Sequence, residues 1–152
     1  MAIRVLAVGR KHENWVAGGI ERYAKRLKKP FDLSWQLIAH SAREHDAARK
    51  EESERLLGKL TGSDFVVLLD ERGATVDSPT LSRTLLQPLE ASRGVTVIIG
   101  GAYGVDTPVR QRAHFVWSLS PLVFPHQLVR LILTEQVYRA QEIAGGRSYH
   151  HG

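Results

Sequence analysis

Short apolar runs recur along the chain and predict the strands of a buried sheet. Three of them, residues 3–8, 65–69 and 95–99, are almost wholly apolar. Such runs are typical of strands that are covered on both faces, as in a parallel sheet. Residues 33–38 alternate between apolar and polar positions, and residues 115–118 form a short further run. The pattern therefore predicts five strands.

Apolar residues at helical spacing predict helices between these strands. Residues 13–28 favour an amphipathic helix. Residues 43–60 are rich in Ala, Glu, Lys and Arg, and we expect the first half of their helix to be largely exposed. Ser78 is a suitable N-cap for a helix that should end near Pro88. Residues 127–143 carry the longest helical pattern.

The predicted strands and helices alternate along the chain, with short connections between them. The alternation predicts an α/β fold in which helices flank a mostly parallel sheet, formed by a single domain over residues 1–152. Ligands of such folds bind outside the carboxyl ends of the strands. Three loops should lie there, at residues 70–77, 100–107 and 119–127, and we expect the functional site among them.

The composition excludes several classes of chemistry. The 152 residues include no cysteine, which rules out a disulfide framework, a cysteine nucleophile and thiolate metal sites. The 7 histidines have no partners at metal-ligand spacing, so we expect no metal. No apolar run approaches the roughly 18 residues of a membrane span, and the apolar start is too short for a signal peptide. We therefore expect no membrane partner and a cytoplasmic protein.

Positive charge is concentrated in the first part of the chain. Residues 1–60 hold 13 basic and 8 acidic side chains, which accounts for the whole net charge of +5. The densest group, here called the basic cluster, consists of Arg22, Lys25, Arg26, Lys28 and Lys29. On a helix these side chains would form either a surface for RNA phosphates or a solvated face, and charge alone leaves both interpretations open.

Three glycines follow the strand predicted at residues 95–99, in the sequence IIGGAYGV. Glycine lets a ligand approach the backbone closely, but a GG pair is also a simple tight turn. The spacing differs from the dinucleotide fingerprint, and the acidic residue that would bind a ribose about 20 residues further on is missing. A phosphate-loop motif is also missing. The segment therefore predicts either a ligand-binding loop or a turn.

An almost uncharged loop, SLSPLVFPHQLVR at residues 118–130, leads into the last helix. Its apolar side chains would wall a pocket for a planar heterocycle, or would form a buried connection under a partner subunit. His126 lies where the last helix is predicted to begin. It is either a residue of the functional site or a capping or surface histidine. Glu135 and Arg139 have the spacing of a helix surface pair.

Several segments of the chain match one protein family. The most specific is the C-terminal block, with WSLSPLVFPHQLVRLILTEQVYRA and the tail RSYHHG. VVLLDERG, VIIGGAYGV and the start VLAVGRKHENWVAGGIERYAKRL match as well. Together these segments resemble the RlmH family of the SPOUT methyltransferase superfamily, and the resemblance covers essentially the whole chain.

The resemblance implies an enzyme that uses S-adenosylmethionine to methylate N3 of a pseudouridine in large-subunit (23S) ribosomal RNA. It also implies action on assembled ribosomes and a homodimer. The implied fold is a SPOUT-type α/β knot, in which the C-terminal chain forms a trefoil by passing through a loop. Knots are very rare in proteins, so this expectation rests on the resemblance alone.

The resemblance also implies site residues. Those implied for the cofactor lie in or beside the strand-end loops: Leu69, Gly100, Gly101, Gly104, Leu119, Ser120, Pro121, Leu122, Val123 and Phe124. Those expected in catalysis or substrate binding are Arg139 and the tail pair Tyr149 and His150. The basic cluster, His126 and Arg130 are expected to contact RNA. His126 is also a candidate for the proton step, and Arg130 and Arg139 could instead lie at the dimer interface. Ala102 and Tyr103 stand where the family often has proline and an acidic residue.

Two other classes of function are compatible with the same residues. One is a non-catalytic ribosome- or RNA-binding factor on the same fold, which would bind RNA without S-adenosylmethionine. The other is an α/β domain that binds a different small ligand, such as a flavin or a nucleotide. The missing phosphate-loop and ribose-binding signatures count against the latter.

Overall fold

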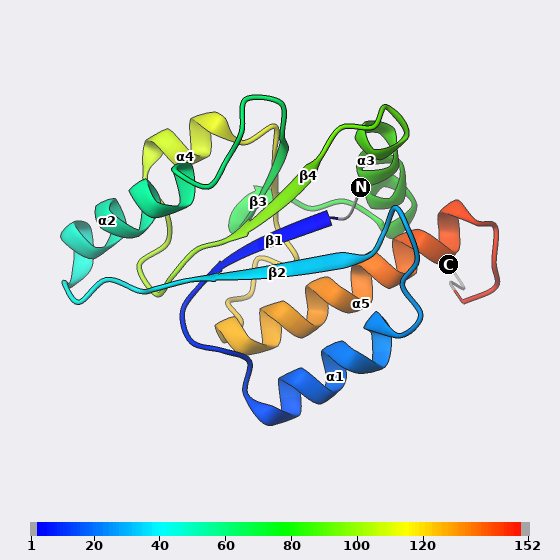
Figure 1. Ribbon diagram of the computed structural model, residues 1–152, viewed down its shortest axis with the longest axis horizontal. Helices are drawn as coiled ribbons and strands as arrows, with labels where there is room; N and C mark the ends of the chain where they lie inside the picture. The colour runs from blue at the N-terminus through cyan, green and yellow to red at the C-terminus, as the bar shows by residue number, and fades with distance from the viewer. Residues whose placement is uncertain (1–2, 150–152) are drawn as a thin grey trace.

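Strands and helices alternate strictly through the computed structural model, which describes residues 3–149 (Figure 1). The strands are β1 (Ile3–Val8), β2 (Leu33–Ile38), β3 (Phe65–Ala74), β4 (Val95–Ile99) and β5 (Phe115–Trp117). The helices are α1 (Asn14–Ala24), α2 (His45–Leu57), α3 (Ser78–Glu90), α4 (Thr107–Arg112) and α5 (His126–Ala144). The alternation confirms the predicted α/β fold class.

The strands form one parallel sheet in the order β2-β1-β4-β3-β5. Ile3 of β1 pairs with Leu33 of β2 on one side and with Val95 of β4 on the other. Val95 in turn pairs with Phe65 of β3. Because these strands run parallel from a common level, their carboxyl ends lie at the same edge of the sheet. The loops that follow them therefore meet at this carboxyl edge.

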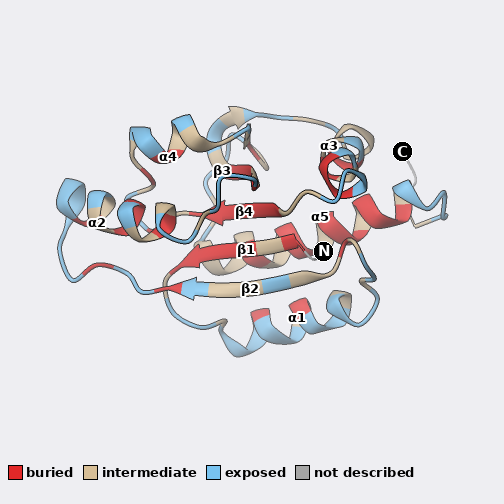
Figure 2. Cartoon of the chain, turned by 45° about the horizontal axis from the view of Figure 1, so that its top comes forward, coloured by how far each residue is buried: buried red, intermediate tan, exposed pale blue. Residues whose placement is uncertain are grey.

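Helices cover both faces of the sheet (Figure 1). On one face, α3 and α5 pack against Ile3, Val5 and Ala7 of β1, and α1 packs on α5. On the other face, α2 and α4 pack against Leu6 and Val8. Figure 2 shows the central strands buried and the outer sides of the helices exposed. Burial on both faces is what the continuous apolar runs predicted.

β3 continues to Ala74, whereas the apolar run predicted that it would end at Leu69. Leu69 and Ala74 both pair with Trp117 of β5, so residues 70–73 leave the ladder between them. These residues carry no apolar pattern, so the continued pairing could not be predicted from them. The irregularity makes residues 70–73 project at the carboxyl edge.

The first two helices are shorter than predicted. α1 ends at Ala24 instead of residue 28, so four of the five members of the basic cluster follow the helix in a turn and a loop. The expectation of one charged helix face was therefore wrong for these four. α2 spans 45–57 instead of 43–60. Within residues 3–149, no helix combines the length and the apolarity needed to cross a membrane.

The N-cap of α3 is Asp77, where the sequence predicted Ser78. The side chain of Asp77 accepts a hydrogen bond from the backbone N–H of Thr80 at 2.8 Å. Ser78 is thus the first helical residue, and the helix continues to Glu90. Aspartate and serine are similarly good N-caps, so only the hydrogen bond in the folded chain distinguishes them.

Gly73 lies where β3 rejoins β5, and no side chain fits there. A Cβ added at this position would lie 2.5 Å from the backbone oxygen of Val116 and 2.9 Å from the backbone nitrogen of Trp117. We expect Gly73→Ala to lower the free energy of unfolding by about 1–3 kcal/mol, because the neighbouring backbone must move. A urea titration followed by circular dichroism measures this change.

The control is Gly62→Ala, because nothing lies within 4 Å of a Cβ added at that glycine. Its stability should stay close to that of the unchanged protein. If the two variants were equally stable, the close approach of β3 to β5 would not be a constraint on the fold.

Candidate functional site

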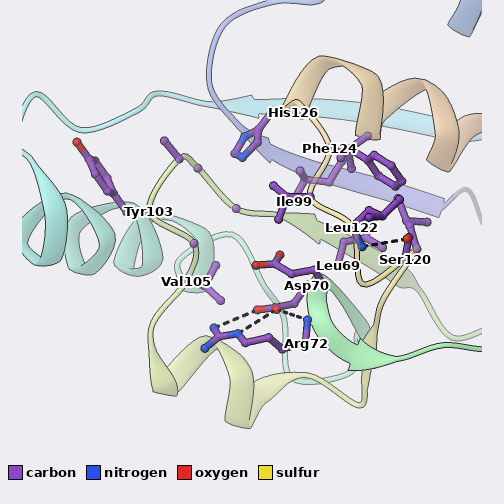
Figure 3. A pocket seen from close by; sticks show the side chains of 18 residues that line it. Leu69, Asp70, Arg72, Ile99, Tyr103, Val105, Ser120, Leu122, Phe124 and His126 are labelled. Carbon is purple, nitrogen blue, oxygen red and sulfur yellow. Dashed lines mark hydrogen bonds and ion pairs between the residues drawn. The ribbon is translucent and has the colours of Figure 1, made fainter.

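A cavity of about 310 Å³ lies at the carboxyl edge of the sheet, between the ends of β3, β4 and β5 (Figure 3). Its walls are residues 69–72, 99–105, 119–120 and 122–124, together with His126 and Val129 of α5. All three predicted strand-end loops thus contribute to one cavity, here called the first cavity.

Most of the residues implied for the cofactor line this cavity. They are Leu69, Gly100, Gly101, Gly104, Leu119, Ser120, Leu122, Val123 and Phe124. Pro121 is exposed and is not part of the wall. The structure therefore brings together nine residues from three segments of the chain that are far apart in sequence.

The loop that follows β4, residues 100–104, is here called the glycine loop. It is both a tight turn and a wall of the first cavity. Gly104 donates its backbone N–H to the oxygen of Gly101 at 3.0 Å and has a φ of +75°, which favours glycine. A Cβ at Gly100 would lie 3.0 Å from Val105 Cγ1. The two interpretations of IIGGAYGV are therefore compatible: the turn needs glycine, and its backbone faces the cavity.

The loop that follows β5, residues 119–124, is here called the apolar loop. It is exposed at its tip. Ser120 stabilises the loop by accepting a hydrogen bond from the backbone N–H of Leu122 at 3.0 Å. Leu122 is 70% exposed and Val123 is 80% exposed. In this chain the loop is therefore not a buried connection. Two neighbouring apolar side chains at the mouth of a cavity are instead suited to contact a ligand or a second subunit.

Two acidic residues in the irregular part of β3 were not among the predicted site residues. Asp70 and Glu71 line the first cavity, and Glu71 is exposed. Burial alone would raise the pKa of Asp70, but hydrogen bonds from Arg72 and the charges of Arg110 and Arg72 hold it below the ordinary value. The Arg72 backbone N–H donates to Asp70 Oδ1 at 2.8 Å. The position of Asp70 and Glu71 directly after the apolar run at residues 65–69 is the signal that could have found them.

His126 lies at the N-terminal end of α5 and lines the first cavity. Burial is the main cause that lowers the pKa of its imidazole, and the positive charge of Arg130 lowers it further. The carboxylates of Glu52 and Glu71 act in the opposite direction without reversing the shift. The imidazole is therefore neutral near pH 7 and can accept a proton.

Arg130 is buried, although the sequence suggested contact with RNA or with a partner subunit. The residue is only 1% exposed. Its Nη1 donates to the backbone oxygen of Arg10 at 2.7 Å and lies 3.2 Å from His12 Nδ1. It thus connects the start of α5 to the loop after β1.

Arg139 and Tyr149 lie near the other end of α5 and line neither the first cavity nor its neighbour. The Tyr149 hydroxyl donates to Glu135 Oε2 at 2.9 Å, and Arg139 Nη2 contacts the same oxygen at 3.0 Å. Burial and the Glu135 carboxylate raise the pKa of Tyr149 to about 12. His150, the other member of the predicted tail pair, lies outside the described residues.

The basic cluster is exposed and lies at this same end of the molecule. Gln141 of α5 accepts a hydrogen bond from the backbone N–H of Lys28 at 2.7 Å and donates to the oxygen of Arg26 at 3.0 Å. Lys25 forms an exposed pair with Glu21 at 3.7 Å. Within one protomer, the basic cluster therefore lies away from the first cavity, at the other end of α5.

Comparison with solved structures shows the class of fold. The chain superposes on a protein from Haemophilus influenzae Rd KW20, described as a "probable methylase family protein", with a TM-score of 0.56 and 11% identity, over 95% of this chain and 66% of that one. A protein from Neisseria gonorrhoeae, described as a "putative methylase family protein", gives a TM-score of 0.54 and 14% identity, over 99% and 86% of the two chains. The chain therefore shares the fold of these two proteins, and the trefoil knot stays a prediction.

Sequence comparison shows the family. The family model described as "Predicted SPOUT methyltransferase" matches residues 1–150. Two relatives are called Ribosomal RNA large subunit methyltransferase H: that of Coxiella burnetii (strain Dugway 5J108-111) is 38% identical, and that of Desulfitobacterium hafniense (strain DSM 10664 / DCB-2) is 40% identical. Each match covers 99% of this chain and 99% of the relative.

The chain therefore belongs to the SPOUT methyltransferase family, in the group of the ribosomal RNA large subunit methyltransferase H proteins. This membership confirms the resemblance found in the sequence. It also confirms the methyltransferase class and S-adenosylmethionine as the cofactor.

The lowered pKa of His126 predicts that acid destabilises the protein. Below the ordinary histidine value of 6.5 the unfolded chain binds a proton that the folded chain resists. The free energy of unfolding should therefore fall as the pH drops below about 6.5. The pKa values of His12 and His114 are lowered as well, mainly by burial, and add to the fall.

Chemical denaturation at a series of pH values tests this expectation. His126→Gln should make the fall in stability between pH 7 and pH 5 shallower, and the exposed His40→Gln is the matched control. An identical pH profile for His126→Gln and the unchanged protein would contradict the half-buried, neutral state of this imidazole.

Proposed function

We propose that this protein methylates N3 of a pseudouridine in large-subunit (23S) ribosomal RNA, using S-adenosylmethionine and acting on assembled ribosomes in the cytoplasm. The observation that carries the proposal is the first cavity, where the glycine loop and the apolar loop enclose about 310 Å³. The names of the relatives that are 38–40% identical support an RNA of the large ribosomal subunit as the substrate.

The walls of the first cavity fit the parts of S-adenosylmethionine. Leu69 and Phe124 offer apolar surface for the adenine ring, and the backbone of residues 100–104 can be approached closely because its glycines lack a Cβ. Glu71 places a carboxylate on the same wall, which suits a positively charged sulfonium. Bound there, S-adenosylmethionine supplies an activated methyl group.

His126 is the candidate base that lies in the wall of this cavity. The N3–H of pseudouridine loses its proton as N3 bonds to the methyl carbon, and a neutral imidazole can take that proton. The pKa of His126, lowered by burial and by Arg130, leaves the imidazole in the accepting form near pH 7. Leu122 and Val123 would close over the reacting groups and exclude water.

A homodimer would bring the remaining predicted residues to the cavity. Within one protomer, Arg139 lies 13 positions after His126, or about 20 Å along a helix. We therefore assign Arg139, Tyr149 and His150 to the cavity of a second copy of the chain. The exposed apolar side chains Trp15, Leu122 and Val123 support such an interface.

Methyl transfer to ribosomes tests the proposed function. The protein is incubated with labelled S-adenosylmethionine and with ribosomes that lack the modification, and naked ribosomal RNA is assayed in parallel. We expect label in large-subunit RNA of whole ribosomes. Gly100→Arg should abolish both cofactor binding and transfer, because its side chain would enter the first cavity.

Gly62→Arg is the matched control, since that glycine lies in open surroundings and the same charge is added. It should retain cofactor binding and transfer. If the protein bound ribosomes but transferred no labelled methyl group to their RNA, the enzymatic proposal would be contradicted. That result would favour the non-catalytic binding factor.

The basic cluster should supply affinity for the ribosome without affecting the cofactor. Replacing Lys25, Arg26, Lys28 and Lys29 with alanine should weaken ribosome binding and lower the slope of log K against log salt by about 1 for each lost phosphate contact. The affinity for S-adenosylmethionine, measured by calorimetry, should not change. Removing Lys50 and Lys59, exposed lysines elsewhere, is the control, and unchanged ribosome affinity of the cluster variant would contradict this assignment.

A further inference from the structure

A second cavity, of about 540 Å³, lies beside the first and shares a wall with it. The shared wall consists of residues 101–103 and His126. From there the second cavity extends to the end of β1, to residues 40–44 and to Glu52 of α2. Tyr103, in the shared wall, points away from the apolar side of the first cavity (Figure 3). A transfer reaction needs two ligands side by side, and these cavities meet at His126.

Glu52 provides the second cavity with a buried carboxylate that has one free oxygen. The residue is 4% exposed. Its Oε2 accepts a hydrogen bond from the backbone N–H of Ser41 at 2.8 Å, whereas Oε1 has no partner among residues 3–149. A Cβ added at Gly101 would lie 2.5 Å from Oε1, so the glycine loop passes very close to this oxygen. Buried polar atoms are rarely left without a partner, which points to a donor that is supplied from outside the chain.

Arg130 provides the same cavity with an unpaired donor. Its guanidinium is held in place by the hydrogen bond from Nη1 to the backbone oxygen of Arg10 at 2.7 Å. Its Nε, by contrast, finds no acceptor in the part of the chain that the structure describes. Two side chains that line the second cavity, Glu52 and Arg130, are thus at least nine-tenths buried, and each has one polar atom without a partner in residues 3–149.

Pseudouridine presents the complementary pair of groups. Its ring is joined to the ribose through C5, so N1 keeps a hydrogen. N1–H, the C2 carbonyl and N3 then follow one another along one edge of the base. Uridine lacks the N1–H, because its N1 carries the ribose. A carboxylate that accepts from N1–H would therefore distinguish the two nucleosides, and a guanidinium beside it would bind the C2 carbonyl.

We propose that the second cavity binds the acceptor base, with Glu52 accepting the N1–H of pseudouridine and Arg130 donating to its C2 carbonyl. N3, the next atom along that edge, then faces the first cavity. Glu52 is thereby the residue that selects pseudouridine over uridine, because uridine would leave its oxygen unpaired. This inference rests on the proposed function and adds to it the place and the recognition of the acceptor.

Charge around the second cavity supports this assignment. Arg10 and Arg43 are exposed and also line it, so they can meet the phosphates on either side of the base. The guanidinium of Arg130 would also face the carbonyl that gains negative charge when N3 loses its proton. The same groups would thus serve both binding and reaction.

The test compares two ribosome substrates. One carries pseudouridine without the methyl group at the target position, and the other carries the unmodified uridine. We expect Glu52→Gln to lower kcat/KM on pseudouridine by roughly 10- to 100-fold and to leave transfer to uridine unchanged. Glutamine retains an oxygen for the Ser41 N–H, but its NH₂ group then replaces the free oxygen. Glu52→Asp, which keeps the carboxylate, should retain part of the preference.

Glu54→Gln, an exposed neighbour on α2, is the matched control and should behave like the unchanged protein. Calorimetry should find S-adenosylmethionine binding preserved in Glu52→Gln, which shows that the variant is folded. An equal loss on both substrates, or an unchanged preference, would overturn the assignment of Glu52. If the unchanged protein methylates neither substrate while binding both ribosomes, the proposed function itself fails and the inference with it.

Discussion

Parallel pairing of the strands is the constraint on which the rest of this structure depends. A parallel strand can follow its neighbour only after a crossover has carried the chain back, so all five strands end at one edge. The loops at residues 70–73, 100–104 and 119–124 meet there although long stretches of sequence separate them. The strand interiors are packed on both faces and leave no room for chemistry. The loops at the edge are free of that packing, so the site forms there.

Polar groups that are costly to bury are gathered at the same edge. Asp70 is stabilised by hydrogen bonds and by two arginine charges, so its carboxylate is accommodated within the chain itself. Glu52 and Arg130 each keep one atom without a partner in residues 3–149. An apolar core would be more stable without such groups, which makes their position beside a cavity informative. The free energy lost by leaving them unpaired is recovered if a ligand supplies the missing partners.

The sequence predicted the parts of the fold that depend on burial and local pattern. The strands at residues 33–38 and 95–99 match the predicted bounds, because packing on the sheet shows directly in the order of side chains. The strand-end loops were predicted for the same reason. Distant contacts account for the errors: β3 continues only because Ala74 pairs with β5, and Arg130 is buried only because Arg10 offers it a carbonyl. Glu52 lies on a charged helix, where nothing in the sequence distinguishes a buried carboxylate from an exposed one.

In the proposed function, the glycine loop and the apolar loop form the cofactor site and the acceptor binds next to it. A crystal structure of the protein with S-adenosylhomocysteine and a pseudouridine nucleoside would locate both ligands. We expect S-adenosylhomocysteine between residues 100–104 and 119–124, with the pseudouridine base against Glu52 and its N3 towards the sulfur. S-adenosylhomocysteine bound in the second cavity, or a base bound away from Glu52, would contradict this expectation.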